Sequence, residues 1–203
     1  ALSDPGALYG RVDAVTIAQD GDTARDLFAI GKLMVDGLPD FLKPEIEYDR
    51  RDELTFPERY TSLAVYTART AGRAIRGKTP FFVHCSEVAY WGEDGEGASL
   101  AIMNSVPMRP GTMVIEETTA NGVGGYFYDN WAAIQAAMDA GHETEWVNFF
   151  SPWFADPRCQ WPLMEGEDKR IMASMDEEER GLVERYALTM EQLKWRRKKI
   201  AEG

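Results

Sequence analysis

An acidic residue directly follows a short apolar run in the middle of the chain. Phe81 to Cys85 is largely hydrophobic and leads into Ser86 and Glu87. A buried strand of this kind holds a carboxylate at its C-terminal end, where open α/β sheets bind ligands. A carboxylate in that place can orient and polarise the water that attacks a γ-phosphate. The pattern therefore predicts Glu87 as a catalytic residue, with Ser86 in the place where an aspartate associated with Mg²⁺ is expected.

His84 lies three residues before Glu87, a spacing that also occurs between metal ligands. In a strand, however, side chains three residues apart point to opposite faces. We therefore expect a structural histidine and no metal site at this pair.

A second apolar run, Thr112 to Ile115, leads into a polar turn of small residues that ends at Gly122. The side chains of Thr118, Thr119 and Asn121 can hydrogen-bond a phosphate or a catalytic water. An ordinary loop between a strand and a helix has the same composition, so both interpretations stay open.

Gly72 to Thr79 matches the phosphate-binding pattern G-x-x-x-x-G-K-[ST]. That loop functions between a strand and a helix whose N-terminal amides face the phosphates. Here Pro80 and the apolar run from Phe81 follow, which favours a basic turn before a strand. A helix after Thr79 would instead support a self-contained P-loop kinase or NTPase that uses Lys78 and Thr79.

The elements that position these residues alternate along the chain, which predicts an α/β fold with a mainly parallel sheet covered by helices on both faces. The expected strands are Val12 to Ala18, Ser62 to Thr67, Phe81 to Cys85, Thr112 to Ile115 and Glu145 to Phe150, with an edge hairpin in Pro44 to Phe56. The expected helices of this part are Thr23 to Leu38, Ala98 to Met108 and Tyr126 to Ala140. Ala68 to Thr79 is expected to be a small, basic connecting stretch.

The character of the sequence changes after Ser151. Prolines punctuate an aromatic loop, Trp153 to Trp161, and helices are expected over residues 176–187 and 190–202. Thr189 and Gln192 form a capping-box pattern before the last helix. We therefore expect a domain over residues 1–151 and a helical linker over residues 152–203.

The composition of the chain argues against several classes of protein. The formal charge of the 203 residues is −12, which argues against a general nucleic-acid-binding surface. No apolar run approaches the ~18 residues of a membrane span, so no membrane partner is expected. The two cysteines are too few for a disulfide framework or a zinc site. Basic residues gather in Lys194 to Lys199, as a solvated helix face or as a DNA contact.

Taken together, these segments resemble the large terminase subunit of tailed bacteriophages, the ATPase of the viral DNA-packaging motor. The resemblance rests on ordered pieces that span nearly the whole chain: residues 18–20 with the helix 23–38 and the run 38–44, residues 71–79, residues 84–91, residues 117–122 with 125–128, residues 149–154 and residues 188–196.

The resemblance implies a P-loop NTPase-like fold of the ASCE type and a role for each candidate residue. Glu87 would be the catalytic glutamate of the Walker B strand, and Ser86 would lie beside it at the nucleotide. Thr118 and Thr119 match the motif that couples hydrolysis to movement, with Asn121 at the same nucleotide site. Arg76 lies where some members place an arginine finger that reaches a neighbouring subunit.

The resemblance also implies ATP and Mg²⁺ as cofactors. The implied partners are double-stranded DNA, the portal protein, the small terminase subunit and further copies in a homo-oligomeric ring, in the cytoplasm of a bacterial host. The family's own P-loop would precede Val12, where eleven residues are too few for it, and its nuclease domain would follow Gly203. We therefore expect the isolated chain to be inactive. A non-catalytic module for motor assembly, using the aromatic loop and the basic last helix, is the other alternative.

Overall fold

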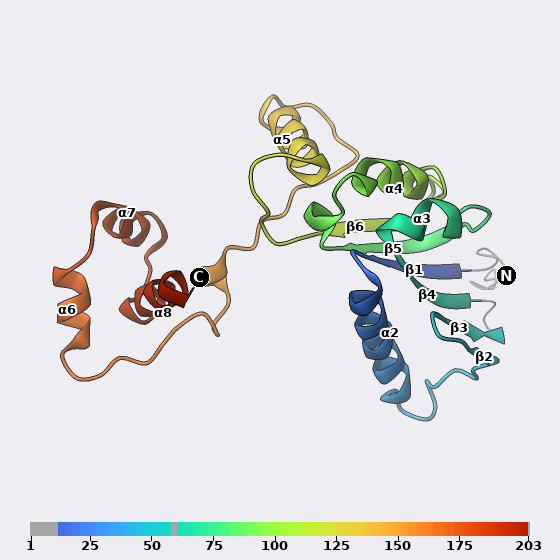
Figure 1. Cartoon of the computed structure of the whole chain (residues 1–203), viewed down its shortest axis with the longest axis horizontal. Helices are drawn as coiled ribbons and strands as arrows, with labels where there is room; N and C mark the ends of the chain where they lie inside the picture. The colour runs from blue at the N-terminus through green and yellow to red at the C-terminus, as the bar shows by residue number, and fades with distance from the viewer. Residues whose placement is uncertain (1–11, 58–60, 203) are drawn as a thin grey trace, which may run out of the picture. The chain divides into compact units, whose positions relative to one another are not determined.

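The computed structural model describes residues 12–57 and 61–202. The chain forms two compact units, unit 1 up to Trp146 and unit 2 from Val147, a division close to the boundary expected at residue 151. Unit 1 is an α/β unit and unit 2 is helical (Figure 1). The expectation that residues 1–11 hold no phosphate-binding loop concerns residues outside the described ranges.

Unit 1 is built on a six-stranded sheet with the order β2-β3-β4-β1-β5-β6. Strands β4, β1, β5 and β6 run parallel, whereas β2 and β3 form an antiparallel hairpin at one edge. The strands are Val12–Ala18 (β1), Tyr48–Asp49 (β2), Glu53–Phe56 (β3), Thr61–Thr67 (β4), Pro80–Ser86 (β5) and Met113–Glu117 (β6). The edge hairpin and the four parallel strands are thereby confirmed.

The helices of unit 1 connect these strands. They are Gly21–Asp36 (α2), Ala68–Ala74 (α3), Asp94–Met103 (α4) and Tyr126–Asp139 (α5), with a 3₁₀ turn at Val88–Tyr90 (η2). Asp20 caps α2 by accepting hydrogen bonds from the amides of Asp22 and Thr23, both at 2.9 Å.

Two expectations about these helices were wrong. The stretch after Thr67 holds helix α3, because a capping box between Thr67 and Thr70 starts a helix there. Helix α4 begins at Asp94 and ends at Met103, earlier than the expected Ala98 to Met108. Acidic side chains in the first turn favour the early start, since they interact well with the positive end of the helix dipole.

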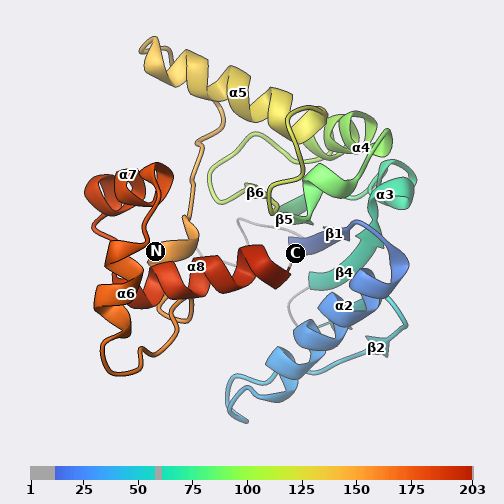
Figure 2. The ribbon, with the colours of Figure 1, turned by 60° about the vertical axis from the view of Figure 1, so that its left-hand side comes forward.

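The two faces of the sheet are covered unequally. Helices α3 and α4 and the start of α5 cover one face, where Val15, Val83 and Cys85 are buried. Helix α2 lies on the opposite side (Figure 2), where Phe28 packs with Val65. Burial raises the pKa of the Cys85 thiol, so this side chain is a small buried hydrophobe of the core.

The expectation of full cover on both faces was wrong for β5 and β6. On the α2 side of these strands, Phe82, Met113 and Ile115 remain 38%, 55% and 39% exposed. Helix α2 contacts β1 and β4 and does not extend over β5 and β6. The outer edge of β6 pairs with no strand in the described part of the chain.

The prediction of a strand at Glu145 to Phe150 was also wrong. This segment contains apolar residues suited to a strand, but it forms none, and Val147, Phe149 and Phe150 are 78%, 82% and 75% exposed. A strand needs a neighbour for its backbone hydrogen bonds, and strand propensity alone does not supply one.

The described residues of unit 2 form three α-helices, Glu167–Ala173 (α6), Glu177–Tyr186 (α7) and Met190–Glu202 (α8), and a 3₁₀ turn at Trp153–Ala155 (η3). The first of these was not expected. Its small core consists of Ile171, Leu188 and Leu193. The capping box is confirmed, because the amide of Thr189 donates to Gln192 Oε1 at 2.9 Å and the amide of Gln192 donates to Thr189 Oγ1 at 3.3 Å.

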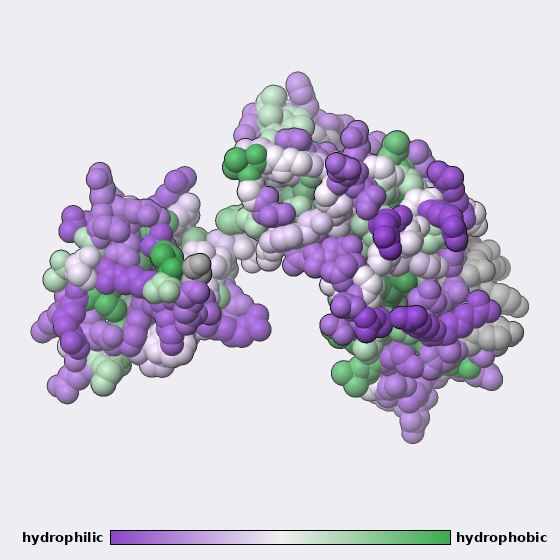
Figure 3. Space-filling model, in the orientation of Figure 1, coloured by the Kyte–Doolittle hydropathy of each residue, from purple (hydrophilic) through white to green (hydrophobic). Residues whose placement is uncertain are grey.

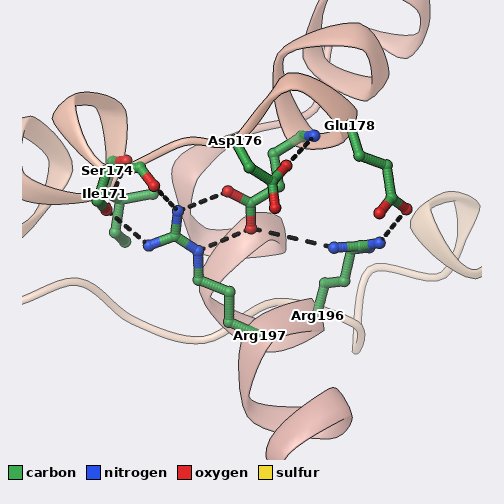
Figure 4. Close-up of polar contacts among 7 residues, drawn as sticks. Ile171, Ser174, Asp176, Glu178, Arg196 and Arg197 are labelled. Carbon is green, nitrogen blue, oxygen red and sulfur yellow. Dashed lines mark hydrogen bonds and ion pairs between the residues drawn. The ribbon is translucent and has the colours of Figure 1, made fainter.

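A buried carboxylate joins α7 to α8 (Figure 4). Arg197 binds Glu179 in two places, Nε to Oε1 at 2.7 Å and Nη2 to Oε2 at 2.5 Å. Arg197 also donates to the hydroxyl of Ser174 at 2.9 Å. The hydrogen bonds from Arg197 lower the pKa of Glu179, and Arg196 binds the neighbouring Glu178. The buried carboxylate of Glu179 and its partner Arg197 therefore help to hold α7 and α8 together.

Replacing Arg197 by Met should destabilise unit 2 by about 3 kcal/mol, because the buried Glu179 carboxylate loses its bidentate partner. Thermal unfolding followed by circular dichroism measures the change. The matched control is Lys199→Met in the same helix, whose partner Glu202 is exposed, and this variant should unfold almost as the parent does. Equal effects of the two substitutions would contradict the assignment.

Candidate functional site

Glu87 has a strained backbone at the C-terminal end of β5. Its φ of 56° and ψ of 46° lie in the left-handed region, which costs a residue with a side chain about 1–2 kcal/mol. The buried indole of Trp91 donates from Nε1 to the carbonyl of Ser86 at 3.0 Å and closes the turn. Strained residues of this kind cluster at functional sites, where the surrounding contacts hold them in place.

The carboxylate of Glu87 is held by the loop that follows β6. Its Oε2 atom accepts hydrogen bonds from Thr118 Oγ1, from the Thr119 amide and from Thr119 Oγ1, each at 3.1 Å. Oε1 takes part in none of these three hydrogen bonds. The orientation of the carboxylate is therefore fixed through one oxygen, and the other is available to a further donor.

Further contacts join the two turns. The amide of Ala89 donates to Thr118 Oγ1 at 3.3 Å, and the side chain of Asn121 donates to the carbonyl of Ala89 at 3.1 Å. The hydroxyl oxygens of Thr119 and Tyr90 are 3.4 Å apart. We call the group formed by Glu87, Tyr90, Thr118, Thr119 and Asn121 the Glu87 site. It brings together residues that the sequence placed on separate strands.

His84 and Ser86 lie next to the Glu87 site in the sequence of β5. His84 Nε2 is 3.3 Å from Glu117 Oε1, on the neighbouring strand, and is not paired with Glu87. Ser86 is buried. In the described residues no group of three or more His, Cys, Asp or Glu side chains could hold a metal ion. The donor set therefore does not fit a magnesium ion bound by protein groups alone.

Arg76 lies apart from the Glu87 site. It is exposed in the turn before β5, whereas Glu87 follows the last residue of that strand. A strand of seven residues places the two about 20 Å apart. Arg76 therefore does not act on the Glu87 site of its own chain.

The P-loop interpretation of Gly72 to Thr79 is wrong, because α3 ends within this segment and strand β5 begins at Pro80. Lys78 instead forms an ion pair with Glu53, Nζ to Oε1 at 3.0 Å. Burial disfavours the charged form of Lys78, but hydrogen bonds to Tyr66 and Glu53 outweigh it and raise the pKa of the ammonium group. Lys78 is thus a structural residue.

Sequence reasoning missed a half-buried carboxyl, that of Glu116, beside the site. Glu116 Oε1 accepts from Ser99 Oγ at 2.8 Å and from the hydroxyl of Tyr126 at 3.2 Å. Burial raises the pKa of Glu116. One feature of the sequence could have revealed it. Glu116 lies two residues after the partly buried Val114 in β6, so its side chain is on the same, inward-facing side of the strand.

No protein-family model matches the sequence, and comparison with curated proteins gives no match either. Within the described ranges, none of the helices has the length and apolar character to cross a bilayer. The surface in Figure 3 is mainly hydrophilic, with hydrophobic residues in small groups.

The left-handed backbone of Glu87 gives a test of stability. Glu87→Gly and Glu87→Ala both remove the carboxylate, but only alanine retains the steric cost of the positive φ. We expect the alanine variant to be less stable than the glycine variant by about 1 kcal/mol. Urea unfolding of the two variants measures the difference, and an alanine variant as stable as the glycine variant would contradict the strain.

Proposed function

We propose that this chain is part of the ATPase motor of a phage terminase, with a P-loop NTPase-like fold of the ASCE type, and that Glu87 activates the water that hydrolyses ATP. The observation that carries the proposal is the Glu87 site. A carboxylate at the C-terminal end of a central parallel strand is held by hydroxyl groups from the end of the adjacent strand. Ligands of open α/β sheets bind at this edge.

The geometry suits a general base. Glu87 Oε2 is occupied by three donors, so the carboxylate keeps one orientation during the reaction. A water bound to Oε1 would transfer a proton to Glu87 while its oxygen attacks the γ-phosphate and the bond to ADP breaks. Thr118 and Thr119 would respond directly to that protonation, because the acceptor they bind loses its negative charge.

The open side of the sheet supports the implied position of the phosphate-binding element. Parallel sheets are normally covered on both faces. The free edge of β6 and the exposed side chains of Phe82, Met113 and Ile115 suit one more parallel strand with a covering helix. The terminase resemblance implies such a strand and helix before Val12, carrying the amides and the lysine that hold the phosphates.

The terminase resemblance also implies an arginine finger, a magnesium ion and several partners, and the structure supports these to different degrees. Arg76 is exposed and distant from Glu87, as an arginine finger directed at a neighbouring subunit of a homo-oligomeric ring would be. The donor set does not fit a protein-held Mg²⁺, so we derive no step through the metal. Double-stranded DNA, the portal protein, the small terminase subunit and the cytoplasm of a bacterial host follow from the proposal alone.

The basic residues of α8 do not favour a DNA contact. Each has a partner inside unit 2: Lys194 binds Glu167, Arg196 binds Glu178, Arg197 binds Glu179, Lys198 lies over the ring of Trp161, and Lys199 binds Glu202. The carboxylates offset the positive charge of four of these five residues, which leaves Lys198 as the one whose charge is not offset by a carboxylate partner in these contacts. We therefore propose that DNA binds elsewhere on the motor.

The aromatic loop likewise gives little support to a non-catalytic assembly module. The rings of Trp153 and Trp195 stack with centroids 5.2 Å apart, and Phe154 packs against Tyr186 at 4.8 Å. The side chain of Gln192 donates to the carbonyl of Phe154 at 2.9 Å. These aromatic residues stabilise unit 2 itself.

The proposal predicts ATP hydrolysis when this chain is joined to the phosphate-binding strand and helix that the resemblance implies. In that protein, Glu87→Gln should lower kcat by at least about 100-fold, because an amide cannot accept the proton of the attacking water. ATP binding should be preserved, since Glu87 orients water and holds no phosphate. Phosphate release and fluorescent nucleotide binding measure the two effects.

Lys78→Met is the control for the P-loop interpretation of Gly72 to Thr79. It removes the lysine of that sequence pattern and should leave the affinity for nucleotide unchanged. If Glu87→Gln retained full hydrolysis, Glu87 would lose its proposed role. If Lys78→Met abolished nucleotide binding, the phosphate-binding function would belong to Gly72–Thr79 after all.

A further inference from the structure

The half-buried carboxyl of Glu116 contacts hydroxyl groups from two helices. Ser99 in α4 donates to it at 2.8 Å, and Tyr126 in α5 lies 3.2 Å and 3.3 Å from its two oxygens. The hydroxyl groups of Tyr126 and Ser99 are themselves 2.6 Å apart. Ser99 is buried, so the group is closed to solvent on the α4 side.

This cluster lies at both ends of one loop. Glu116 is in β6, two residues before Thr118, and Tyr126 is the first residue of α5. The segment between them, residues 118–125, carries the two threonines that bind Glu87. Gly122, Gly124 and Gly125 have positive φ values of 78°, 150° and 84° and make its backbone easy to bend. A flexible loop keeps its shape only if its ends are fixed.

Helix α5 has few other attachments. None of its residues is buried, and its main contacts with other helices of unit 1 are with α4 and η2, besides the contact of Tyr126 with Glu116 in β6. Figure 2 shows one end of α5 beside α4 while the rest extends away. Tyr126 lies in close contact with Gly95 of α4, where an added Cβ atom would be 3.3 Å from the Cβ of Tyr126. The first turn of α5 is therefore where this helix is attached.

We propose that Glu116 is a positioning residue for the Glu87 site, which fixes both ends of the loop 118–125 through Ser99 and Tyr126 and so holds Thr118 and Thr119 on Glu87. The catalytic meaning of this role rests on the proposed function, but the positioning can be measured without nucleotide. A change in the contact between Thr119 and Glu87 would reach α5 through the same loop.

The test uses the 203-residue chain and the amide of Thr119, which donates to Glu87 Oε2 at 3.1 Å. Tyr126→Phe removes one hydroxyl and keeps the ring packed on α4. Amide exchange at Thr119, measured by NMR, should become about tenfold faster, because the loop is then held at one end only. The amide of Val83 in β5 should keep its rate.

Tyr128→Phe is the matched control, since it is the same chemical change two residues further along α5 at a side chain 45% exposed. It should leave exchange at Thr119 unchanged. Equal acceleration at Thr119 and Val83 would mean that Tyr126 supports only the global fold, and the proposal would fail. An unchanged Thr119 rate in Tyr126→Phe would also overturn it.

Substitution of Glu116 itself completes the test. Glu116→Gln keeps a carbonyl oxygen for the two hydroxyl groups and should preserve slow exchange at Thr119, whereas Glu116→Ala should accelerate it. If the amide of Thr119 exchanged at the same rate in both variants, the proposed role of the Glu116 hydrogen bonds would be wrong. The outcome is independent of hydrolysis, so failure of the ATPase proposal and failure of the positioning role are distinguishable.

Discussion

Three hydrogen bonds to a single oxygen of Glu87 connect the ends of β5 and β6, and the rest of the site depends on them. A left-handed glutamate is unfavourable by itself. It persists because the indole of Trp91 closes the turn on one side and the threonine loop binds the carboxylate on the other. The same contacts stabilise the left-handed backbone of Glu87 and fix the orientation of its carboxylate.

These contacts give the loop 118–125 a double attachment. At Glu87 the loop is bound by the half-buried Thr118 and the exposed Thr119. At Glu116 the attachment is more protected, because Ser99 is buried and Glu116 and Tyr126 are half-buried. The two attachments of the loop therefore differ in their access to solvent.

Much of unit 1 could be predicted from the sequence, because its strands are apolar runs bounded by turn residues and so carry a local signal. The location of Glu87 and of the threonine turn at the C-terminal ends of two strands could be predicted, because parallel strands present these ends at one edge. The hydrogen bonds from Thr118 and Thr119 to Glu87 were not predicted and are known from the structure. Segments whose structure depends on distant partners escaped prediction. Glu145 to Phe150 has the composition of a strand but no neighbour, and Glu116 gained its partners only through packing of α4 and α5.

The two cysteines differ in a way that has practical value. Cys85 is buried in the sheet with a raised pKa, so it forms little of the thiolate that reacts with electrophiles. Cys159 is partly exposed, in the loop of unit 2 that leads towards α6. A thiol-directed fluorophore would therefore attach to unit 2 in the unmodified chain. Cys159 is therefore a natural site for labelling with one fluorophore. The unfolding of unit 2 can then be measured by fluorescence without a substitution in the Glu87 site.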